Sequence, residues 1–142
     1  MVPLPDTFQL EIVTPERLVV RDTADEVQIP GKNGYLGILP GHAPLISELS
    51  VGQISYRNGS ETHYLWVAWG FAEVLPDKVT ILAETAERGE DVDCNRAQKA
   101  KERAEQRLTS ADPEVDVPRA QDALARANSR LEAAAKEGKT VS

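Results

Sequence analysis

Six arginines in the last third of the chain have a spacing that could bind a polyanion. Arg96, Arg103 and Arg107 are seven and four residues apart, which places them on one face of a helix. The same spacing recurs 23 residues later, at Arg119, Arg126 and Arg130. Two facing helices would bring several of these guanidinium groups together. Because guanidinium forks suit phosphate oxygens, a polyphosphate ligand is one interpretation of the pattern.

A solvated helix face that neutralises its own charge is the other interpretation. Glu102, Glu105 and Asp122 stand where pairs within one helix could balance part of the positive charge. Residue types alone leave both interpretations open.

The remaining reactive residues predict neither a catalytic site nor a metal site. His42, His63 and Cys94 show none of the His/Cys spacings of metal centres. The glycine-rich segment 31–37 lacks the Lys-Ser/Thr end of a phosphate loop, and no serine lies in a nucleophile elbow. His42 lies in a loop constrained by Pro and Gly, where it is either a structural histidine bonded to backbone carbonyls or an exposed contact residue.

Composition limits the class of protein further. The 142 residues carry a formal net charge of −7, which argues against nonspecific binding to nucleic acid. No apolar run reaches the roughly 18 residues of a membrane span, so we expect no direct membrane insertion. The single cysteine cannot form an intramolecular disulfide, which fits a reducing compartment.

The chain divides into two halves of different composition. All seven aromatic residues precede residue 72, whereas residues 91–142 hold eleven alanines and equal numbers of acidic and basic groups. The first 90 residues carry the whole net charge of −7. We therefore predict an α+β protein with one domain over 1–89 and a second over 90–142.

The first half has the pattern of short β-strands. Apolar and polar residues alternate from Phe8 to Ile12, around Gln28 and around Ser55. Asn58-Gly59 between two apolar runs predicts a hairpin with a type I′ turn. The nearly continuous apolar run 64–75 predicts a strand buried on both faces. Short strands with Gly/Pro punctuation are typical of a β-sandwich or flattened barrel.

The second half contains an internal repeat that predicts two helices. Residues 92–108 align without gaps on residues 115–131, with ten of 17 positions identical. Each copy begins with a residue suited to cap a helix, Asp93 or Asp116, and the segment 109–114 supplies the turn. The stripes that face each other are rich in alanine and bury little surface. We therefore expect an antiparallel hairpin that depends on the sandwich, a ligand or a partner.

Three motifs in order resemble a known family. The chain resembles the epsilon subunit of F-type ATP synthases in three segments and in the two-helix tail that follows them. The segments are 34–45 (GYLGILPGHAPL), 70–74 (GFAEV) and 79–86 (VTILAETA). The resemblance implies a sandwich of about ten strands and a noncatalytic role in the rotating central stalk. It implies the gamma subunit and the c-ring as partners, and also the alpha/beta head when the hairpin extends and restrains ATP hydrolysis.

The resemblance also implies specific sites. Some bacterial members bind ATP through a motif matched here by Val92-Asp93-Cys94-Asn95-Arg96-Ala97, which makes ATP a candidate regulatory ligand rather than a required cofactor. Carried over residue by residue, the ATP site comprises Glu87, Asp93, Arg96, Ala97, Arg103, Arg126 and Arg130. The c-ring contacts carry over to Tyr35 and His42, although some relatives have a carboxylate where Tyr35 stands.

The family also implies a place in the cell. We expect a peripheral membrane protein on the cytoplasmic face of a bacterial inner membrane, in preference to a plastid thylakoid. Two other functions remain: a free-standing ATP-binding sensor without an obligate rotary partner, and an enzyme built on a β-sandwich, for which the residues offer no catalytic group.

Overall fold

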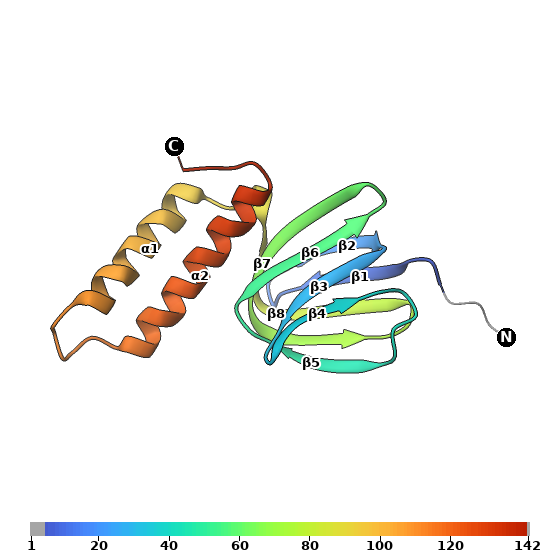
Figure 1. Cartoon of the computed structure of the whole chain (residues 1–142), viewed down its shortest axis with the longest axis horizontal. Coiled ribbons are helices and arrows are strands. Elements are labelled where there is room, and N and C mark those ends of the chain that lie inside the picture. Colours follow the sequence, from blue (N-terminus) through green and yellow to red (C-terminus); the bar gives the residue numbers. More distant parts are fainter. Residues whose placement is uncertain (1–4, 142) are drawn as a thin grey trace.

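A computed structural model describes residues 5–141 of the chain (Figure 1). These residues form eight strands, a short 3₁₀ turn and two helices. In chain order the elements are β1 (Phe8–Val13), β2 (Leu18–Ala24), β3 (Glu26–Gly31), β4 (Gly34–Ile38), β5 (Leu45–Leu49), β6 (Gly52–Asn58), β7 (Glu61–Val74), β8 (Lys78–Arg88), η1 (Gly89–Asp91), α1 (Cys94–Thr109) and α2 (Val117–Lys136).

The strands form a sandwich in which the two layers share bent strands. The hydrogen-bonded order is β2-β1-β8-β7-β5-β3-β4, with β6 paired to β3 and β7. β7 bends where Trp69 and Gly70 adopt φ values of 59° and 130°, and its register with β8 continues unchanged across the bend. The first half of β7 pairs with β6 and the second half with β5. The long strand thereby passes from one layer to the other.

The expected strand number differs from the observed one for a structural reason. The resemblance predicted about ten strands, and the described chain has eight. β7 and β8 are 14 and 11 residues long and pair with each other from Leu65 opposite Arg88 to Val74 opposite Val79, through the bend. Counting the two halves of each long strand separately gives ten segments, so the predicted sandwich architecture is confirmed with fewer, longer strands.

The apolar alternation seen in the sequence marks the sandwich core. Phe8, Leu10 and Ile12 of β1 are buried together with the inward residues of the other strands. The predicted double burial of segment 64–75 holds only for residues 65–68, and beyond them Trp69 and Phe71 are exposed. Residues 65–68 have the core on one face and the helical hairpin on the other, which explains the limit.

The β6–β7 hairpin is confirmed, but its turn differs from the prediction. Asn58 pairs with Glu61, so Gly59 and Ser60 are the two turn residues. Gly59 has φ of 62°, whereas Ser60 has no positive φ, which excludes a type I′ turn and fits glycine at the first position of a type II′ turn. Asn58 is held in the strand because its side chain donates to Asp22 at 3.1 Å.

The two predicted helices are present and begin at the predicted caps. The side chain of Asp93 accepts a hydrogen bond from the backbone N–H of Arg96, and Asp116 does the same for Arg119, both at 3.1 Å. Each cap satisfies one of the free N–H groups of a first helical turn. The buried faces carry mainly alanine, which allows α1 and α2 to pack closely.

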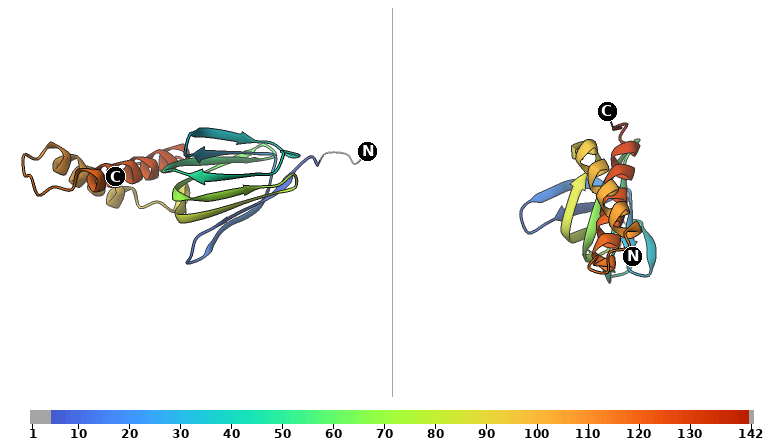
Figure 2. Two further views of the ribbon diagram at one scale, coloured as in Figure 1. Left: turned by 90° about the horizontal axis from the view of Figure 1, so that it is seen from below. Right: turned by 90° about the vertical axis from the view of Figure 1, so that its left-hand side faces the viewer.

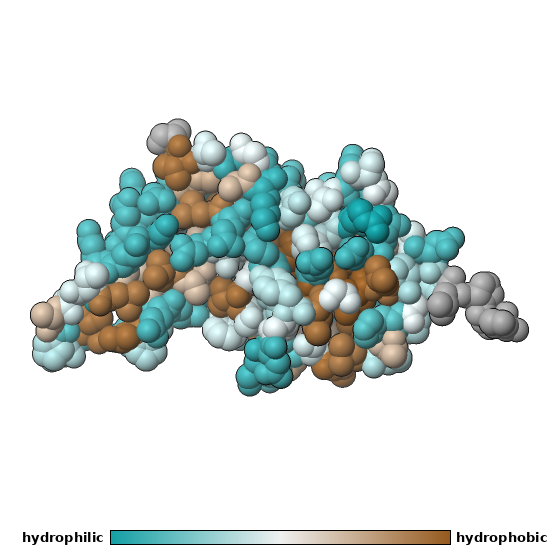
Figure 3. Space-filling view, viewed as in Figure 1, coloured by the Kyte–Doolittle hydropathy of each residue, from teal (hydrophilic) through white to brown (hydrophobic). Residues whose placement is uncertain are grey.

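The hairpin lies at one end of the sandwich, with α2 against the strands and α1 outside it (Figures 1 and 2). A second apolar cluster joins the two parts and contains Trp66, Ala68, Val92, Cys94, Ala97, Ala133 and Ala134. Hydrophilic residues cover much of the visible hairpin surface, and hydrophobic ones gather between its helices and on the sandwich (Figure 3). Neither helix of residues 5–141 combines the length and the apolar character that a membrane-spanning helix requires.

Candidate functional site

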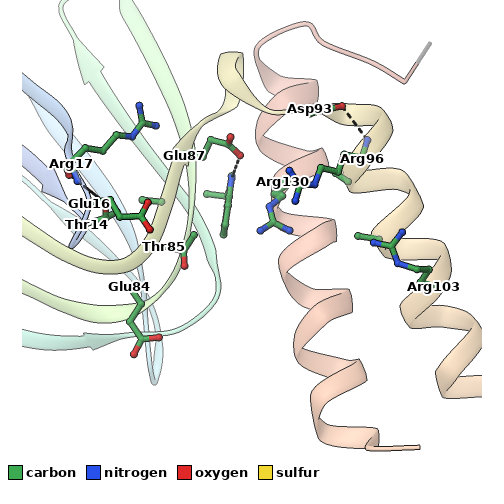
Figure 4. Close-up of a pocket in the computed structure, with 14 residues that line it drawn as sticks. Thr14, Glu16, Arg17, Glu84, Thr85, Glu87, Asp93, Arg96, Arg103 and Arg130 are labelled. Atoms are coloured by element: carbon green, nitrogen blue, oxygen red, sulfur yellow. Dashed lines mark hydrogen bonds between the residues drawn. The ribbon is translucent and has the colours of Figure 1, made fainter.

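A cavity of about 520 Å³ lies between the hairpin and the sandwich. Arg96 and Arg103 from α1 and Arg130 from α2 face Glu84, Thr85 and Glu87 from β8 across it (Figure 4). The β1–β2 turn closes one side. The full lining is Thr14, Glu16, Arg17, Trp66, Glu84, Thr85, Ala86, Glu87, Asp93, Arg96, Ala97, Ala100, Arg103 and Arg130.

The structure brings together six of the seven residues that the resemblance assigned to an ATP site. They are Glu87, Asp93, Arg96, Ala97, Arg103 and Arg130. Residues 96 and 103 are two helical turns apart, so both reach the same side of α1. Residue 130 faces them from the antiparallel helix α2.

Arg126 is the member of the set that does not line the cavity. Its Nε lies 3.0 Å from a carboxylate oxygen of Asp122, one turn earlier in α2, although the geometry is not that of a hydrogen bond. The interpretation of a self-neutralised helix face therefore applies to this arginine. It leaves Arg126 close enough to influence Arg130 without sharing the cavity wall.

Arg130 lies over an aromatic ring whose N–H is bonded to a carboxylate. Its Cζ lies 4.3 Å from the ring centroid of Trp66, whose Nε1 donates to Glu87 Oε1 at 3.0 Å. Burial lowers the pKa of the Arg130 guanidinium, and Glu87 acts in the opposite direction. The charges of Arg126 and Arg96 lower this pKa further.

The three cavity arginines that come from the hairpin, Arg96, Arg103 and Arg130, have no ion-pair partner among residues 5–141. Every salt bridge found there involves other cations. Arginine is always charged at neutral pH, and like charges held together are stabilised by a shared anion. The helical wall is therefore suited to a ligand with several anionic oxygens, and the volume is within the ~300–1,000 Å³ of ligand pockets.

The sandwich wall of the cavity could not be predicted from the sequence. Its unpredicted members are Thr14, Glu16, Arg17, Trp66, Glu84, Thr85 and Ala86. They come from the β1–β2 turn and from two strands, far from the arginine repeat in sequence. Only the packing of α2 on the sandwich brings them together, and no local pattern encodes that packing.

The two residues assigned to a c-ring contact lie at different places along β4. Tyr35 is 59% exposed near its start, and its hydroxyl accepts from the backbone N–H of Gln53 at 2.9 Å. His42 follows its end, and its Nδ1 lies 2.6 Å from the carbonyl oxygen of Ala43. The structural interpretation of His42 accounts for that ring contact. A partner role for either residue stays a prediction.

The fold and the cavity define a class of protein: a β-sandwich that carries an arginine-rich helical hairpin folded against it. Two family models match the chain, the ATP synthase delta/epsilon chain β-sandwich domain over residues 7–89 and the delta/epsilon chain long α-helix domain over residues 90–135. The chain belongs to this family of ATP synthase subunits, which confirms the predicted noncatalytic role.

Individual relatives agree with the family assignment. The chain is 72% identical over 109 residues to an ATP synthase epsilon chain of Koribacter versatilis, covering 77% of each. It is 52% identical over 102 residues to that of Nitratidesulfovibrio vulgaris, covering 72% of this chain and 76% of the relative. A chain in the cryo-EM structure of the Euglena gracilis mitochondrial ATP synthase shares the fold, with a TM-score of 0.80, 24% identity and coverage of 94% and 84%.

Proposed function

We propose that this chain is a regulatory subunit of the ATP synthase central stalk whose hairpin binds ATP in the cavity and is thereby held against the sandwich. The single observation that carries the proposal is the set of three arginines, Arg96, Arg103 and Arg130, that converge on one cavity without an ion-pair partner in the described chain. A triphosphate supplies several anionic oxygens that these three guanidinium groups can bind directly. Glu87 and Asp93, on the same lining, orient the remainder of the nucleotide.

ATP acts as a clamp in this proposal because its binding site has two separate walls. The arginines belong to the hairpin, and Glu84, Thr85 and Glu87 belong to β8. A ligand that contacts both walls binds only the folded arrangement, so it stabilises that arrangement by mass action. When ATP leaves, the alanine-rich hairpin is held by its remaining contacts alone and extends toward the alpha/beta head, where it restrains hydrolysis.

The sandwich supplies the rotary attachment. We assign the gamma subunit and the c-ring as its partners, with Tyr35 and His42 at the c-ring. Family membership supports the assignment, as do structural relatives taken from assemblies described as F1/c-ring and as central stalk/c-ring. The bacterial relatives support a place on the cytoplasmic face of a bacterial inner membrane. Membership of the family favours this role over that of a free-standing sensor.

Calorimetry with matched arginine variants tests ATP binding. Arg103→Ala removes a cavity arginine, and Arg107→Ala removes an exposed arginine one turn further along α1. Charged hydrogen bonds contribute about 1.5–3 kcal/mol, so we expect Arg103→Ala to weaken ATP binding about tenfold or more and Arg107→Ala to leave it unchanged. Absence of heat with millimolar ATP, or equal losses in the two variants, would contradict the proposal.

A further inference from the structure

Trp66 contacts a charged residue on each of the two cavity walls, Glu87 on the sandwich and Arg130 on the hairpin. It lies on β7 and is only 1% exposed. Its indole N–H donates to Glu87 Oε1 at 3.0 Å, and the face of its ring lies 4.3 Å from the guanidinium carbon of Arg130. One buried side chain of the sandwich therefore touches the anionic group of β8 and the cationic group of α2.

The two contacts use different parts of the indole, so they can be made together. The N–H lies at the ring edge and needs an acceptor when it is buried. The ring face carries the negative quadrupole that attracts a cation. The ring is itself fixed by packing in the apolar cluster with Val92, Ala97 and Ala133. Because the ring is fixed, it can hold the Glu87 carboxylate and the Arg130 guanidinium in constant positions.

Apart from the Trp66 ring, no direct contact within residues 5–141 fixes the long side chain of Arg130. Among the described residues it forms no salt bridge and no side-chain hydrogen bond, and arginine has about 2 kcal/mol of rotamer entropy to lose. Without the ring beneath it, the guanidinium would sample many positions in and out of the cavity. Glu87 likewise has the indole N–H as its hydrogen-bond partner in the described chain.

We propose that Trp66 is the positioning residue of the nucleotide site: it presets Glu87 and Arg130 at a fixed separation and so determines the affinity for the triphosphate. This inference rests on the proposed function. It also makes the site conditional on the hairpin, because Trp66 belongs to the sandwich and Arg130 to α2. The ring–guanidinium contact exists only while the hairpin is folded against the strands.

Two variants of Trp66 and one control separate positioning from general docking. Trp66→Phe keeps an aromatic face and removes the N–H, and Trp66→Leu removes both. Tyr64→Leu is the control, because it removes another contact between a cation of α2 and an aromatic ring of β7. The Lys136 ammonium lies 5.4 Å from the centroid of the Tyr64 ring, and neither residue lines the cavity. We expect ATP affinity by calorimetry to fall about thirtyfold in Trp66→Leu, about threefold in Trp66→Phe and not at all in Tyr64→Leu.

A readout without ligand keeps this inference distinct from the proposed function. NMR of the ligand-free protein should give a dispersed, slowly exchanging Arg130 Nε–H signal that becomes averaged in Trp66→Leu and is retained in Tyr64→Leu. If the wild-type chain fails to bind ATP while the signal behaves in this way, the proposed function falls and the positioning role stands. The inference is overturned if Trp66→Leu leaves the signal unchanged, or if Tyr64→Leu abolishes it equally.

Discussion

Gln53 and Ser129 join the sandwich to the hairpin across 76 positions of sequence. The side-chain Nε2 of Gln53 donates to the backbone oxygen of Ser129 at 2.6 Å, and the Oε1 of the same amide is buried with no partner in the described chain. A buried acceptor without a partner costs about 1–3 kcal/mol, and the middle of this range lies above the roughly 1 kcal/mol gained from a typical hydrogen bond. The Gln53 amide therefore opposes hairpin docking more than it favours it.

Replacing this amide with an apolar side chain of similar size should therefore strengthen docking. We expect Gln53→Met to increase the hydrogen-exchange protection of the amides of α2. The matched control is Gln98→Met, which changes a glutamine of α1 that bonds Glu102 within its own helix. Reduced protection in Gln53→Met would show instead that the bond to Ser129 dominates.

Lys139 holds the end of the hairpin onto the segment that precedes α1. Its ammonium donates to the carbonyl oxygens of Glu90 at 2.9 Å and Val92 at 2.7 Å. Bonds from charged donors contribute about 1.5–3 kcal/mol, so we expect Lys139→Met to weaken hairpin docking by about 1.5 kcal/mol or more. Hydrogen exchange of α2 measures the change. Lys99→Met, at an exposed position of α1, should have no effect.

Gly89 marks a point where the backbone of the sandwich and the hairpin come into close contact. A Cβ atom at this position would collide with the backbone carbonyl of Ala133 in α2. Gly89→Ala should displace α2 and cost about 1–3 kcal/mol of docking, with the sandwich strands intact. Gly37→Ala is the control because a Cβ there has nothing within 4 Å. Equal hydrogen exchange of α2 in the two variants would contradict the close contact.

Tyr56 makes the stability of the sandwich depend on pH in the alkaline range. Burial raises its pKa from 10.0 to about 12, and its hydroxyl donates to Asp22 at 3.2 Å. Between these two pH values the unfolded chain has released the proton and the folded chain retains it. The stability contribution is therefore complete below pH 10.0 and is lost as the pH rises toward 12. Chemical denaturation of Tyr56→Phe should show a shallower fall over this range than the wild type.

Much of the fold could be predicted because the sequence encodes it locally. The alternation from Phe8 to Ile12 follows from a strand with one buried face, and Asp93 and Asp116 are caps whose partners lie three residues away. The bend at Trp69 could not be predicted, because a positive φ in a bulky residue is imposed by packing between layers. The turn after β6 shifted by one residue because Asp22, far away in sequence, holds Asn58 in the strand.

The site divides in the same way. Helical spacing placed Arg96 and Arg103 together, and the repeat placed Arg130 opposite them. Helical spacing could not show that Arg126 is absent from the cavity lining. Its side chain lies beside the carboxylate of Asp122, one turn earlier in α2. Trp66 showed only as one residue of an apolar run, and its contact with Arg130 depends on how the hairpin docks.

If ATP in the cavity holds the hairpin against the sandwich, the distance between these two parts of the chain depends on the nucleotide. Spin labels at Ser60 in the β6–β7 turn and Ser110 beyond α1, both exposed, report hairpin position in a Cys94→Ala background. Without nucleotide, pulsed electron resonance should give the folded distance together with a longer one from the extended hairpin. With ATP only the folded distance should remain, and the longer one should return in Arg103→Ala. An identical distribution with and without saturating ATP would contradict the account.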